Sequence, residues 1–508
     1  MIAAIGAVAL LSVLSAAALA AAQGDLGLTQ RDLDRKKAFA AAQAGIADFS
    51  YHLNNDNSYW AKCTNVPTPN AMNNVGETTN RRQLSGGGEY AIESLPAEGY
   101  AKCDPSDAES MIEKAEGVAG TFRIRSTGFD GDEEVSLVAA YKRTSFLDFI
   151  YMTNYETSDP LTYGTSSEVT RANNECKKYR REHRSSWCST IVFRTGDEIR
   201  GPLHTNDELA VCGSPKFGRG PADTIEVSAK DPGWFDYGCS GFGKAQPEFV
   251  GPLKTTADTL EPPPTNGQLK SIAGPAYTFT CVSSIVLNGT NMTIESYNFK
   301  GTKPFPSSGV VYIANGTESD CSESGRKWSA CPSLSSPYKA TYSKEVKCGN
   351  VFVSGNYSGR LTIAADNDII INGNINREGT GMLGLIANNF IRVWHPYPTE
   401  SGAGSCGSGS GSEGIENIEI DAAILAIAHS FLVDHYDCGS GLGKLTVNGS
   451  ISQQFRGPVG TTGSPGTGYL KNYTYDDRLR YIEPPHFLEP VKSSWRIQRE
   501  NLDINPFG

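Results

Sequence analysis

The sequence predicts a mainly β protein in which one long N-terminal helix and a small antiparallel sheet precede an elongated body of the β-solenoid or β-helix kind. Three observations lead to this prediction. The first fifty residues are rich in alanine and carry apolar residues at helical spacing, whereas from about Phe146 onward short apolar runs alternate with glycine and asparagine. In addition, one apolar motif recurs after about forty residues, a period typical of stacked coils.

These patterns divide the chain of 508 residues into four segments. We expect a helix of transmembrane length at 1–22, an amphipathic helix with a small sheet at 23–145, a first β-rich half at 146–275 and a second, solenoid-like half at 276–508. The two halves share a duplicated marker, which is Arg200-Gly-Pro-Leu in one and Arg456-Gly-Pro-Val in the other. Proline lacks the N–H that a strand ladder needs, so both markers indicate strand ends or edges.

Residues 1–22 contain no charged side chain, and as a helix they would be about 33 Å long, which is enough to span a bilayer. Two interpretations stay open. The alanines before Gln23 would suit cleavage by a signal peptidase. The lack of any Lys or Arg ahead of the apolar run instead favours a retained segment or a true start that is missing.

The following segment keeps the helical period. Its apolar residues at spacings of three and four are Phe39, Ala42, Ile46, Phe49 and Leu53. This spacing places all five on one face of an amphipathic helix. Asp48 lies off this stripe, so we expect its replacement by alanine to matter far less than a charge placed on the stripe.

The stretch from Ala38 to Phe49 reads Ala-Phe-Ala-Ala-Ala-Gln-Ala-Gly-Ile-Ala-Asp-Phe and resembles the A-x-x-A-x-A-G-[IV] signature of minor type IV pilins of the PilX-like group. The resemblance implies that the helix packs against other pilin subunits in a filament core, with Gly45 added to the packing stripe. It also implies passage through a membrane before assembly and a final place on a bacterial cell surface. At position five this chain has Ile5 where major pilins carry a Glu, which resembles minor, tip-proximal pilins.

A β-hairpin is expected over residues 121–143, because apolar and polar side chains alternate from Thr121 and a Gly/Asp-rich turn follows. Its Ser126-Thr127-Gly128 step resembles the hairpin of pilin head domains. Asp130 and Asp132 in the turn are weak candidates for calcium ligands. The full ligand spacing of a calcium loop is absent, so a solvated Asp-Gly turn is the favoured interpretation.

Twelve cysteines are scattered along the chain, and none forms a C-x-x-C pair. They are Cys63, Cys103, Cys176, Cys188, Cys212, Cys239, Cys281, Cys321, Cys331, Cys348, Cys406 and Cys438. This even number predicts six disulfides that form in an oxidising compartment outside the cytoplasm. Because short loops close most easily, we expect Cys176 to pair with Cys188 and Cys321 with Cys331.

The body shows two further sequence features. Ile386-Ala-Asn-Asn-Phe-Ile recurs as Ile427-Ala-His-Ser-Phe-Leu, which predicts two stacked coils, and the Ser/Gly tract at 401–414 reads as a surface insertion between them. The C-terminal run from Lys471 resembles the ends of large PilX-like proteins. Its charged residues are expected to form a cap that closes the last coil. They are Asp476, Asp477, Arg478 and Arg480.

The formal net charge is −11 and the sequence shows no basic stripe, so nucleic acid is not an expected partner. A surface or glycan ligand stays a candidate. Six Asn-x-Ser/Thr sequons could carry glycans in a secreted chain, although several are Asn-Gly steps that also favour turns, and we favour turn chemistry. They begin at Asn288, Asn291, Asn315, Asn356, Asn448 and Asn472.

Because β-helices also carry polysaccharide-active enzymes, Asp421, His429, Asp434 and His435 have to be weighed as a catalytic set. A buried or stacked histidine is the favoured account. We therefore expect no catalytic residue, no cofactor and no metal. The leading hypothesis is a structural subunit of a type IV pilus-like filament, minor or at the tip, whose large β body serves adhesion or assembly. The alternative is a membrane-anchored β-helix enzyme acting on polysaccharide, or a binding module.

Overall fold

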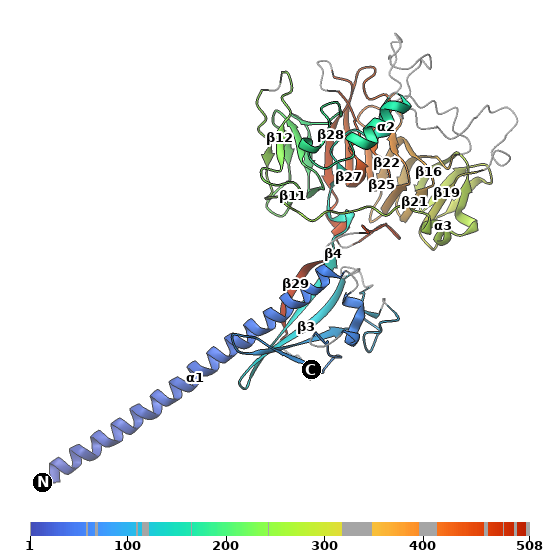
Figure 1. Ribbon diagram of the computed structural model, residues 1–508. Coiled ribbons are helices and arrows are strands. Elements are labelled where there is room, and N and C mark those ends of the chain that lie inside the picture. The colour runs from blue at the N-terminus through green and yellow to red at the C-terminus, as the bar shows by residue number, and fades with distance from the viewer. Residues whose placement is uncertain are drawn as a thin grey trace. The chain divides into compact units, whose positions relative to one another are not determined.

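The chain forms two compact units in a computed structural model, which Figure 1 shows as a ribbon. The first, the helix–sheet unit, comprises Met1–Thr144 and Ser494–Gly508, and the second, the solenoid unit, comprises Ser145–Ser493. The structure describes residues 2–503, with the side chains described from Thr29 onward. The gaps are 57–58, 67–69, 108–109, 114–120, 164, 242, 317–347, 396–413, 462–465, 481 and 492–494.

The helix–sheet unit is built on one unbroken helix, α1 (Ile2–Asn55), which continues through Gly24 and Gly27. A short 3-10 helix, η1 (Tyr59–Asn65), follows it. The sheet is antiparallel with the strand order β1-β2-β3-β4-β29. Its strands are β1 (Arg81–Gln83), β2 (Glu89–Leu95), β3 (Thr121–Asp130), β4 (Glu133–Arg143) and β29 (Trp495–Asp503). The expected hairpin at 121–143 is therefore present as β3 and β4.

The last strand of the chain belongs to this first sheet. β29 pairs antiparallel with β4, from Trp495 opposite Arg143 to Asp503 opposite Ser136. The sequence had placed 494–508 with the second β-rich half, because a short strand pattern does not state which sheet edge it will join. The solenoid unit is thus inserted between two neighbouring strands of the helix–sheet unit.

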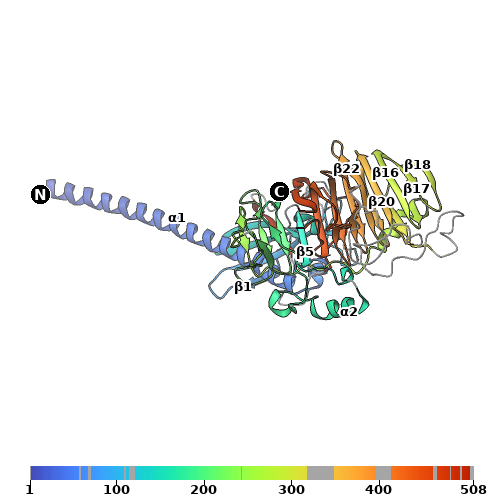
Figure 2. The ribbon, with the colours of Figure 1, turned by 90° about the horizontal axis from the view of Figure 1, so that it is seen from above.

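The solenoid unit consists mainly of short strands that pair in parallel, coil upon coil, and Figure 2 shows β16, β20 and β22 side by side. Its first half contains β5 (Tyr151–Tyr155), β6 (Phe193–Arg194), β7 (Glu198–Arg200), β8 (Leu203–Thr205), β9 (Leu209–Cys212), β10 (Lys216–Phe217), β11 (Ile225–Val227), β12 (Trp234–Asp236), β13 (Glu248–Phe249) and β14 (Leu253–Lys254). The helices α2 (Ser166–Glu175) and α3 (Gln268–Ala273) lie between strands. The solenoid expected from the sequence is therefore observed.

The second half continues the same stack. Its strands are β15 (Thr278–Thr280), β16 (Ser283–Gly289), β17 (Asn291–Glu295), β18 (Lys300–Pro304), β19 (Val310–Ala314), β20 (Val351–Tyr357), β21 (Arg360–Ala365), β22 (Ile369–Arg377), β23 (Met382–Ala387), β24 (Ile391–Val393), β25 (Glu419–Ala426), β26 (Phe431–Val433), β27 (Gly441–Phe455) and β28 (Gly468–Tyr475). Only β16, β17 and β18 pair antiparallel among these described strands.

The two halves meet at a seam in the middle of the stack rather than following one another end to end. The first half stacks outward from β5 and β7 through β8 and β10 to β13 and β14. The second half returns to the same place, where β27 pairs with β5 and β28 pairs with β7. The solenoid unit therefore begins and ends its stack at this seam, between two halves that grow in opposite directions.

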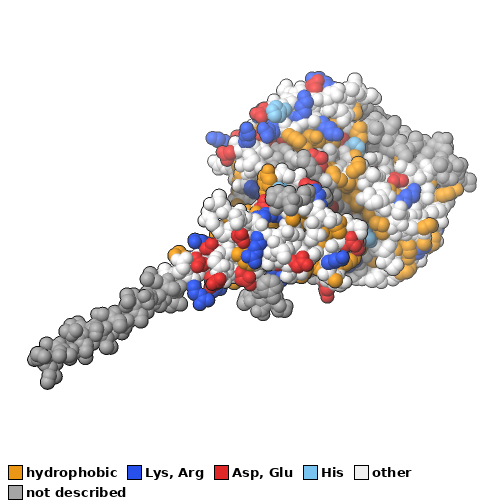
Figure 3. Space-filling model, turned by 60° about the horizontal axis from the view of Figure 1, so that its bottom comes forward, with side chains coloured by type: hydrophobic (Ala, Val, Ile, Leu, Met, Phe, Trp, Pro, Cys, Tyr) orange, Lys and Arg blue, Asp and Glu red, His pale blue; other side chains and the backbone are white. Residues whose placement is uncertain are grey.

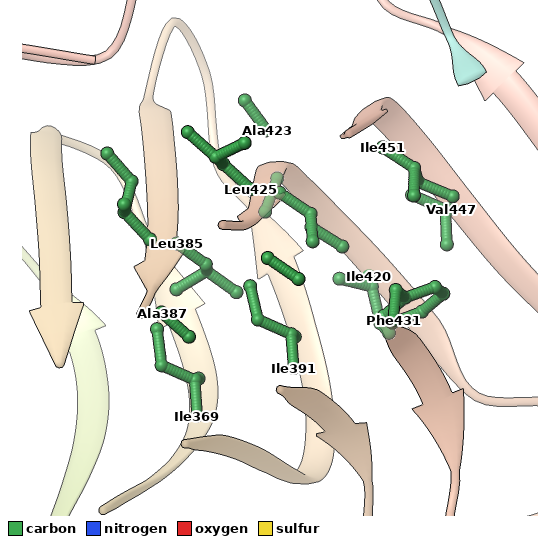
Figure 4. Close-up of a cluster of buried hydrophobic side chains, with 14 of the residues drawn as sticks. Ile369, Leu385, Ala387, Ile391, Ile420, Ala423, Leu425, Phe431, Val447 and Ile451 are labelled. Carbon is green, nitrogen blue, oxygen red and sulfur yellow. The ribbon is translucent and has the colours of Figure 1, made fainter. Parts of the chain in front are cut away.

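Apolar side chains fill the interior of the coils. Figure 4 shows Ile369, Leu385, Ile391, Leu425 and Phe431 together in this core, and all five are buried. Aliphatic β-branched runs form such strands because their side chains pack well on a pleated surface that is buried on both faces. The recurrent motif marks two successive coils, as predicted. The strand register differs from the sequence match, however, because Ile391 and not Phe390 lies opposite Phe431.

One feature expected to form turns lies within strands instead. Asn448-Gly449 is part of β27, where a Cβ on Gly449 would come within 1.9 Å of the carbonyl oxygen of Ala422 in the neighbouring coil. This glycine permits close packing of coils and does not reverse the chain. Asn288-Gly289, in contrast, ends β16 at a true turn, with a positive φ of 61° at Gly289.

Candidate functional site

The predicted helical stripe packs against the sheet of its own unit. Ala42, Ile46, Phe49 and Leu53 are buried in the core that α1 shares with β2, β3 and β4. Phe39 is the exception, with 38 % of its surface exposed. The stripe thus contributes to the intramolecular core, and packing between subunits would have to use other side chains of the helix.

Two glycines explain how closely α1 lies on the sheet. A Cβ on Gly45 would lie 2.1 Å from Ser126 Oγ, and a Cβ on Gly128 would lie 1.9 Å from the carbonyl oxygen of Ala38. A Cβ at Gly128 would meet the helix backbone, so this position requires glycine, whereas a Cβ at Gly45 would force the Ser126 and Tyr90 side chains to shift. The small residues of the Ala38–Phe49 stretch and of the Ser126-Thr127-Gly128 step therefore lie at the contact between helix and sheet. The resemblance to pilins had implied contacts between helices of different subunits.

Aromatic rings complete this core around Phe49. Its ring centroid lies 5.2 Å from that of Tyr59, 5.9 Å from Phe122 and 5.4 Å from Tyr141. The hydroxyl of Tyr141 lies 2.8 Å from Ser50 Oγ, and burial raises the pKa of Tyr141 well above its usual value. Such ring pairs stabilise a core by about 0.5–1.5 kcal/mol each beyond the area that they bury.

The opposite face of α1 carries apolar side chains that are exposed among the described residues, apart from the half-buried Ala44. We call it the outer helix face and define it by Leu33, Ala40, Ala44, Ala47 and Tyr51, which recur at helical spacing. Leu33 is 47 % and Tyr51 is 65 % exposed. Two large apolar residues therefore frame a run of small ones on an accessible surface.

Charged residues at the start of the described part of α1 are mostly paired. Lys37 Nζ lies 3.2 Å from Asp130 Oδ2, and Arg31 Nε lies 3.2 Å from Glu133 Oε1. Figure 3 shows acidic and basic side chains intermingled in this region. In the turn that was considered as a calcium site, Asp130 forms an ion pair with Lys37 and Asp132 is exposed. Among the described residues, no group of acidic, histidine or cysteine side chains is arranged to hold a metal ion.

Asp48 has partners that its place off the stripe did not indicate. Its carboxylate forms an ion pair with Arg82 on β1, and His52 Nε2 lies 3.4 Å from it. The Arg82 side chain is only 11 % exposed, so this pair links α1 to the sheet edge. Replacing Asp48 would remove this ion pair, although Arg82 would keep its contacts with the Ala71 carbonyl and the Tyr90 ring, so we expect a larger effect than the position off the stripe predicted.

The predicted membrane segment at 1–22 lies outside the side chains that the structure describes. Among the described residues, no helix is both long enough and apolar enough to cross a membrane.

The four residues weighed as a catalytic set contact structural partners, and two of them, Asp434 and His435, share His395. His429 stacks on Phe390 with ring centroids 4.5 Å apart, and its Nδ1 lies 2.8 Å from Asp159 Oδ2. Asp434 is fully buried and accepts a hydrogen bond from Arg392 Nε at 2.9 Å. Burial lowers the pKa of His435, whose Nδ1 lies 3.0 Å from the carbonyl oxygen of His395.

The fourth residue of this set serves the strand ladder. Asp421 Oδ2 accepts from the backbone N–H of Arg377 at 2.9 Å, and Asp421 Oδ1 accepts from Asn448 Nδ2 at 2.8 Å. The described contacts therefore join no two of the four, and the favoured account of a stacked histidine is confirmed for His429.

The charged C-terminal motif bridges the two halves and does not close a last coil. Asp476 Oδ2 accepts from Arg377 Nη1 at 2.7 Å, on a strand of the second half. Asp477 accepts from Arg219 of the first half at 2.7 Å. The motif follows β28, which ends at the seam, so it reaches coils on both sides. The sequence indicated a charged edge but not its position within the stack.

Buried ion pairs also cross the seam, and sequence reasoning missed them. Arg456 Nη1 lies 3.0 Å from Glu156 Oε2, and its guanidinium lies 3.5 Å from the ring centroid of Phe193. Lys471 Nζ lies 2.9 Å from Asp197 Oδ2, and burial lowers the pKa of this lysine. The duplicated Arg-Gly-Pro marker contained Arg456 but gave no sign that it would be buried.

The disulfides follow the prediction where the structure describes them. Cys176 pairs with Cys188, as expected, and Cys63–Cys103 and Cys212–Cys239 are further bonds. Cys281, Cys348 and Cys438 are also disulfide-bonded, and no free cysteine occurs among the described residues. The expected pair Cys321–Cys331 and Cys406 lie outside the described residues.

The sequons differ in accessibility. Asn288, Asn291, Asn315 and Asn356 are exposed. Asn448 and Asn472 are half-buried, and their amide nitrogens donate to Asp421 and to Thr446 respectively. A glycan on either of these two would have to replace a hydrogen bond within the ladder.

Comparisons with known proteins return little. No family profile matches the chain, and no curated protein is significantly similar to it. Among solved structures, the crystal structure of the competence-associated pilin ComZ from Thermus thermophilus matches with a TM-score of 0.28 and 12 % identity, over 92 % of this chain and 98 % of that chain. A TM-score this low does not establish a shared fold, so the architecture of the present chain stands on its own strand pairing.

Proposed function

We propose that this protein is a structural subunit of a type IV pilus-like surface filament, where α1 packs among other subunits and the solenoid unit serves adhesion or assembly. The single observation that carries the proposal is the division of α1 into two faces. Ile46 and Phe49 anchor the helix to its own sheet, while the outer helix face is left accessible along the same turns. A helix with both properties can join its unit to neighbouring copies.

The length of α1 supports this role. The helix continues from Asn55 back to Ile2, and the sequence of 2–22 has no charged residue. An uncharged helical segment of this length suits either a bilayer or the apolar core of a filament. We propose a minor subunit or a tip subunit, because the inserted solenoid unit is larger than the unit that carries α1.

The proposal assigns no catalysis to the solenoid unit. Asp421, His429, Asp434 and His435 each hydrogen-bond or ion-pair with structural partners. Catalysis of glycoside cleavage needs two carboxyl groups that face one substrate. These contacts favour a structural account of all four residues.

Two adjacent positions on α1 allow a matched test. Ile46→Asp places an unpaired charge in the core and should lower the free energy of unfolding of the helix–sheet unit by several kcal/mol. Ala47→Asp places the same charge on the exposed face and should change the free energy of unfolding by less than about 0.5 kcal/mol. We expect Ala47→Asp to abolish incorporation into filaments, measured by immunoblot of sheared surface filaments, while the isolated protein keeps its thermal unfolding midpoint.

Normal incorporation of a stable Ala47→Asp protein would contradict a role of the outer helix face in assembly. A cryo-EM map of the native filaments should in addition show α1 of this chain inside the filament core. Purification of the native protein as a monomer, with no filament associated, would overturn the proposed function itself.

A further inference from the structure

A loop of the solenoid unit concentrates positive charge in an otherwise acidic chain. The disulfide Cys176–Cys188 closes this basic loop, which contains five Lys or Arg residues and one Glu and so has a formal charge of +4, against −11 for the whole chain. The five cations are Lys177, Lys178, Arg180, Arg181 and Arg184. The total charge of the chain concealed this local excess, which is why no basic surface was expected.

Buried contacts hold the basic loop from its inner side. Asp207 is fully buried, accepts a hydrogen bond from the backbone N–H of Arg180 at 2.6 Å and forms an ion pair with the Arg184 guanidinium. The ring of Tyr179 stacks on Tyr155 with centroids 4.9 Å apart. Together with the disulfide, these contacts fix the loop before any partner arrives, which lowers the entropy cost of binding.

The other cations point outward. Lys177, Lys178 and Arg181 are exposed, and none of the three forms an ion pair with another described residue. The Arg181 guanidinium lies 5.0 Å from the ring centroid of Phe235, which limits its movement. The inner side of the loop therefore anchors it, and the outer side presents three exposed cations that form no ion pair with the described residues, although Glu175 is near enough to Lys178 to interact with it electrostatically.

The side chains of the loop narrow the class of partner. Insertion into a bilayer needs exposed apolar side chains, and the loop has only the aromatics Tyr179 and Trp187. Trp187 already stacks on Tyr163 with centroids 4.7 Å apart, so neither aromatic is free to stack on nucleic-acid bases. Lysine and arginine charges without an apolar or stacking element suit acidic groups repeated along a flexible polymer.

We propose that the basic loop binds an acidic polysaccharide, a glycan polymer that carries carboxylate or phosphate groups. This inference does not depend on filament assembly, because the loop is complete within the solenoid unit.

The test uses the full chain in a non-ionic detergent, with polygalacturonate as the acidic polysaccharide and dextran as a neutral one. The variant Lys177→Gln/Lys178→Gln/Arg181→Gln should bind polygalacturonate about tenfold more weakly at low salt. The slope of log affinity against log salt should also fall by about two to three, because three charge contacts are lost. Dextran should bind neither protein.

A matched control removes the same charge elsewhere in the solenoid unit. Lys270→Gln/Lys300→Gln/Lys444→Gln changes three other exposed lysines and should bind polygalacturonate like the unaltered protein. An intact Cys176–Cys188 bond, verified by mass spectrometry, shows that the variants keep the loop. Equal binding by both triple variants overturns the proposal. Tighter binding of duplex DNA or of phosphatidylglycerol vesicles than of polygalacturonate also overturns it and assigns the loop to that partner.

Discussion

Gly128 lies where α1 and β3 come closest, and its lack of a side chain permits that contact. A Cβ there would lie 1.9 Å from the Ala38 carbonyl oxygen and 2.5 Å from the Ala42 nitrogen. Both atoms belong to the helix backbone, which cannot rotate away as a flexible side chain could. At this position the distance between helix and sheet therefore leaves no room for a Cβ.

Gly128→Ala should lower the free energy of unfolding of the helix–sheet unit by about 1–3 kcal/mol or more, because the helix must shift. Gly86→Ala is the control, since a Cβ at Gly86 would meet nothing within 4 Å, and its cost should stay below about 0.5 kcal/mol. Hydrogen exchange of peptides from α1 and β3 measures the difference. Equal protection in both variants would show that the close contact is not needed.

Single residues also show what sequence reasoning could reach. The period of Ile46, Phe49 and Leu53 predicted a packed face, and the structure confirms their burial. The period could not predict the surface against which these side chains pack, because it indicates which side chains are buried and not what buries them. Asp48 was underestimated for the same reason: Arg82, its partner, lies on a strand distant in sequence.

The strands at the seam join two halves through buried charges. β27 and β5 pair in parallel, and Arg456 and Glu156, which follow these two strands, form an ion pair with side-chain exposures of 1 % and 0 %. Breaking a buried pair by removing one partner is costly, because the other charge stays buried alone.

Arg456→Met should therefore destabilise the solenoid unit by about 3–5 kcal/mol. Adding Glu156→Leu should recover much of this loss, since no uncompensated charge remains. Arg200 occupies the same place in the duplicated marker but is 53 % exposed, so Arg200→Met should change stability by less than about 1 kcal/mol. Hydrogen exchange of β5 and β27 in the three variants checks this order. If Arg200→Met lowered the stability of the solenoid unit as much as Arg456→Met does, the special role of the seam would be refuted.

The strand register explains why the repeat was found but not its alignment. The sequence match sets Phe390 against Phe431, whereas the ladder sets Ile391 against Phe431. Side chains alternate between faces along a strand, so a shift of one residue reverses which of them point inward. The motif spans a coil corner whose length differs between the two coils, with three residues between β23 and β24 and four between β25 and β26, so the register shifts there. The fold class was therefore predictable and the pairing was not.

At the scale of the whole molecule, the helix–sheet unit depends on residues from both ends of the chain. Trp495 on β29 packs into the same core as Phe49, and its ring centroid lies 4.9 Å from that of Phe122. This contact could not be predicted from the sequence, because the solenoid unit separates Trp495 from every other residue of that core.

A chain that ends at Ser493 should therefore lose stability in the helix–sheet unit by about 3–5 kcal/mol, through loss of the tryptophan and of the edge strand. The solenoid unit should keep its protection from proteolysis, since its strand pairing does not include β29. Leu502→Ala is the control, because Leu502 is 49 % exposed and contributes little to the core. Limited proteolysis followed by mass spectrometry distinguishes the units, and cleavage throughout the solenoid unit in the truncated chain would contradict their independence.

The position of β29 has a consequence for biosynthesis. Synthesis from the N-terminus delivers α1 and β4 first and β29 last. The helix–sheet unit can reach its final stability only when translation is complete, however early its other strands fold. A prematurely terminated chain would thus carry an intact helix on an unfinished head, which proteases could remove before it enters any assembly.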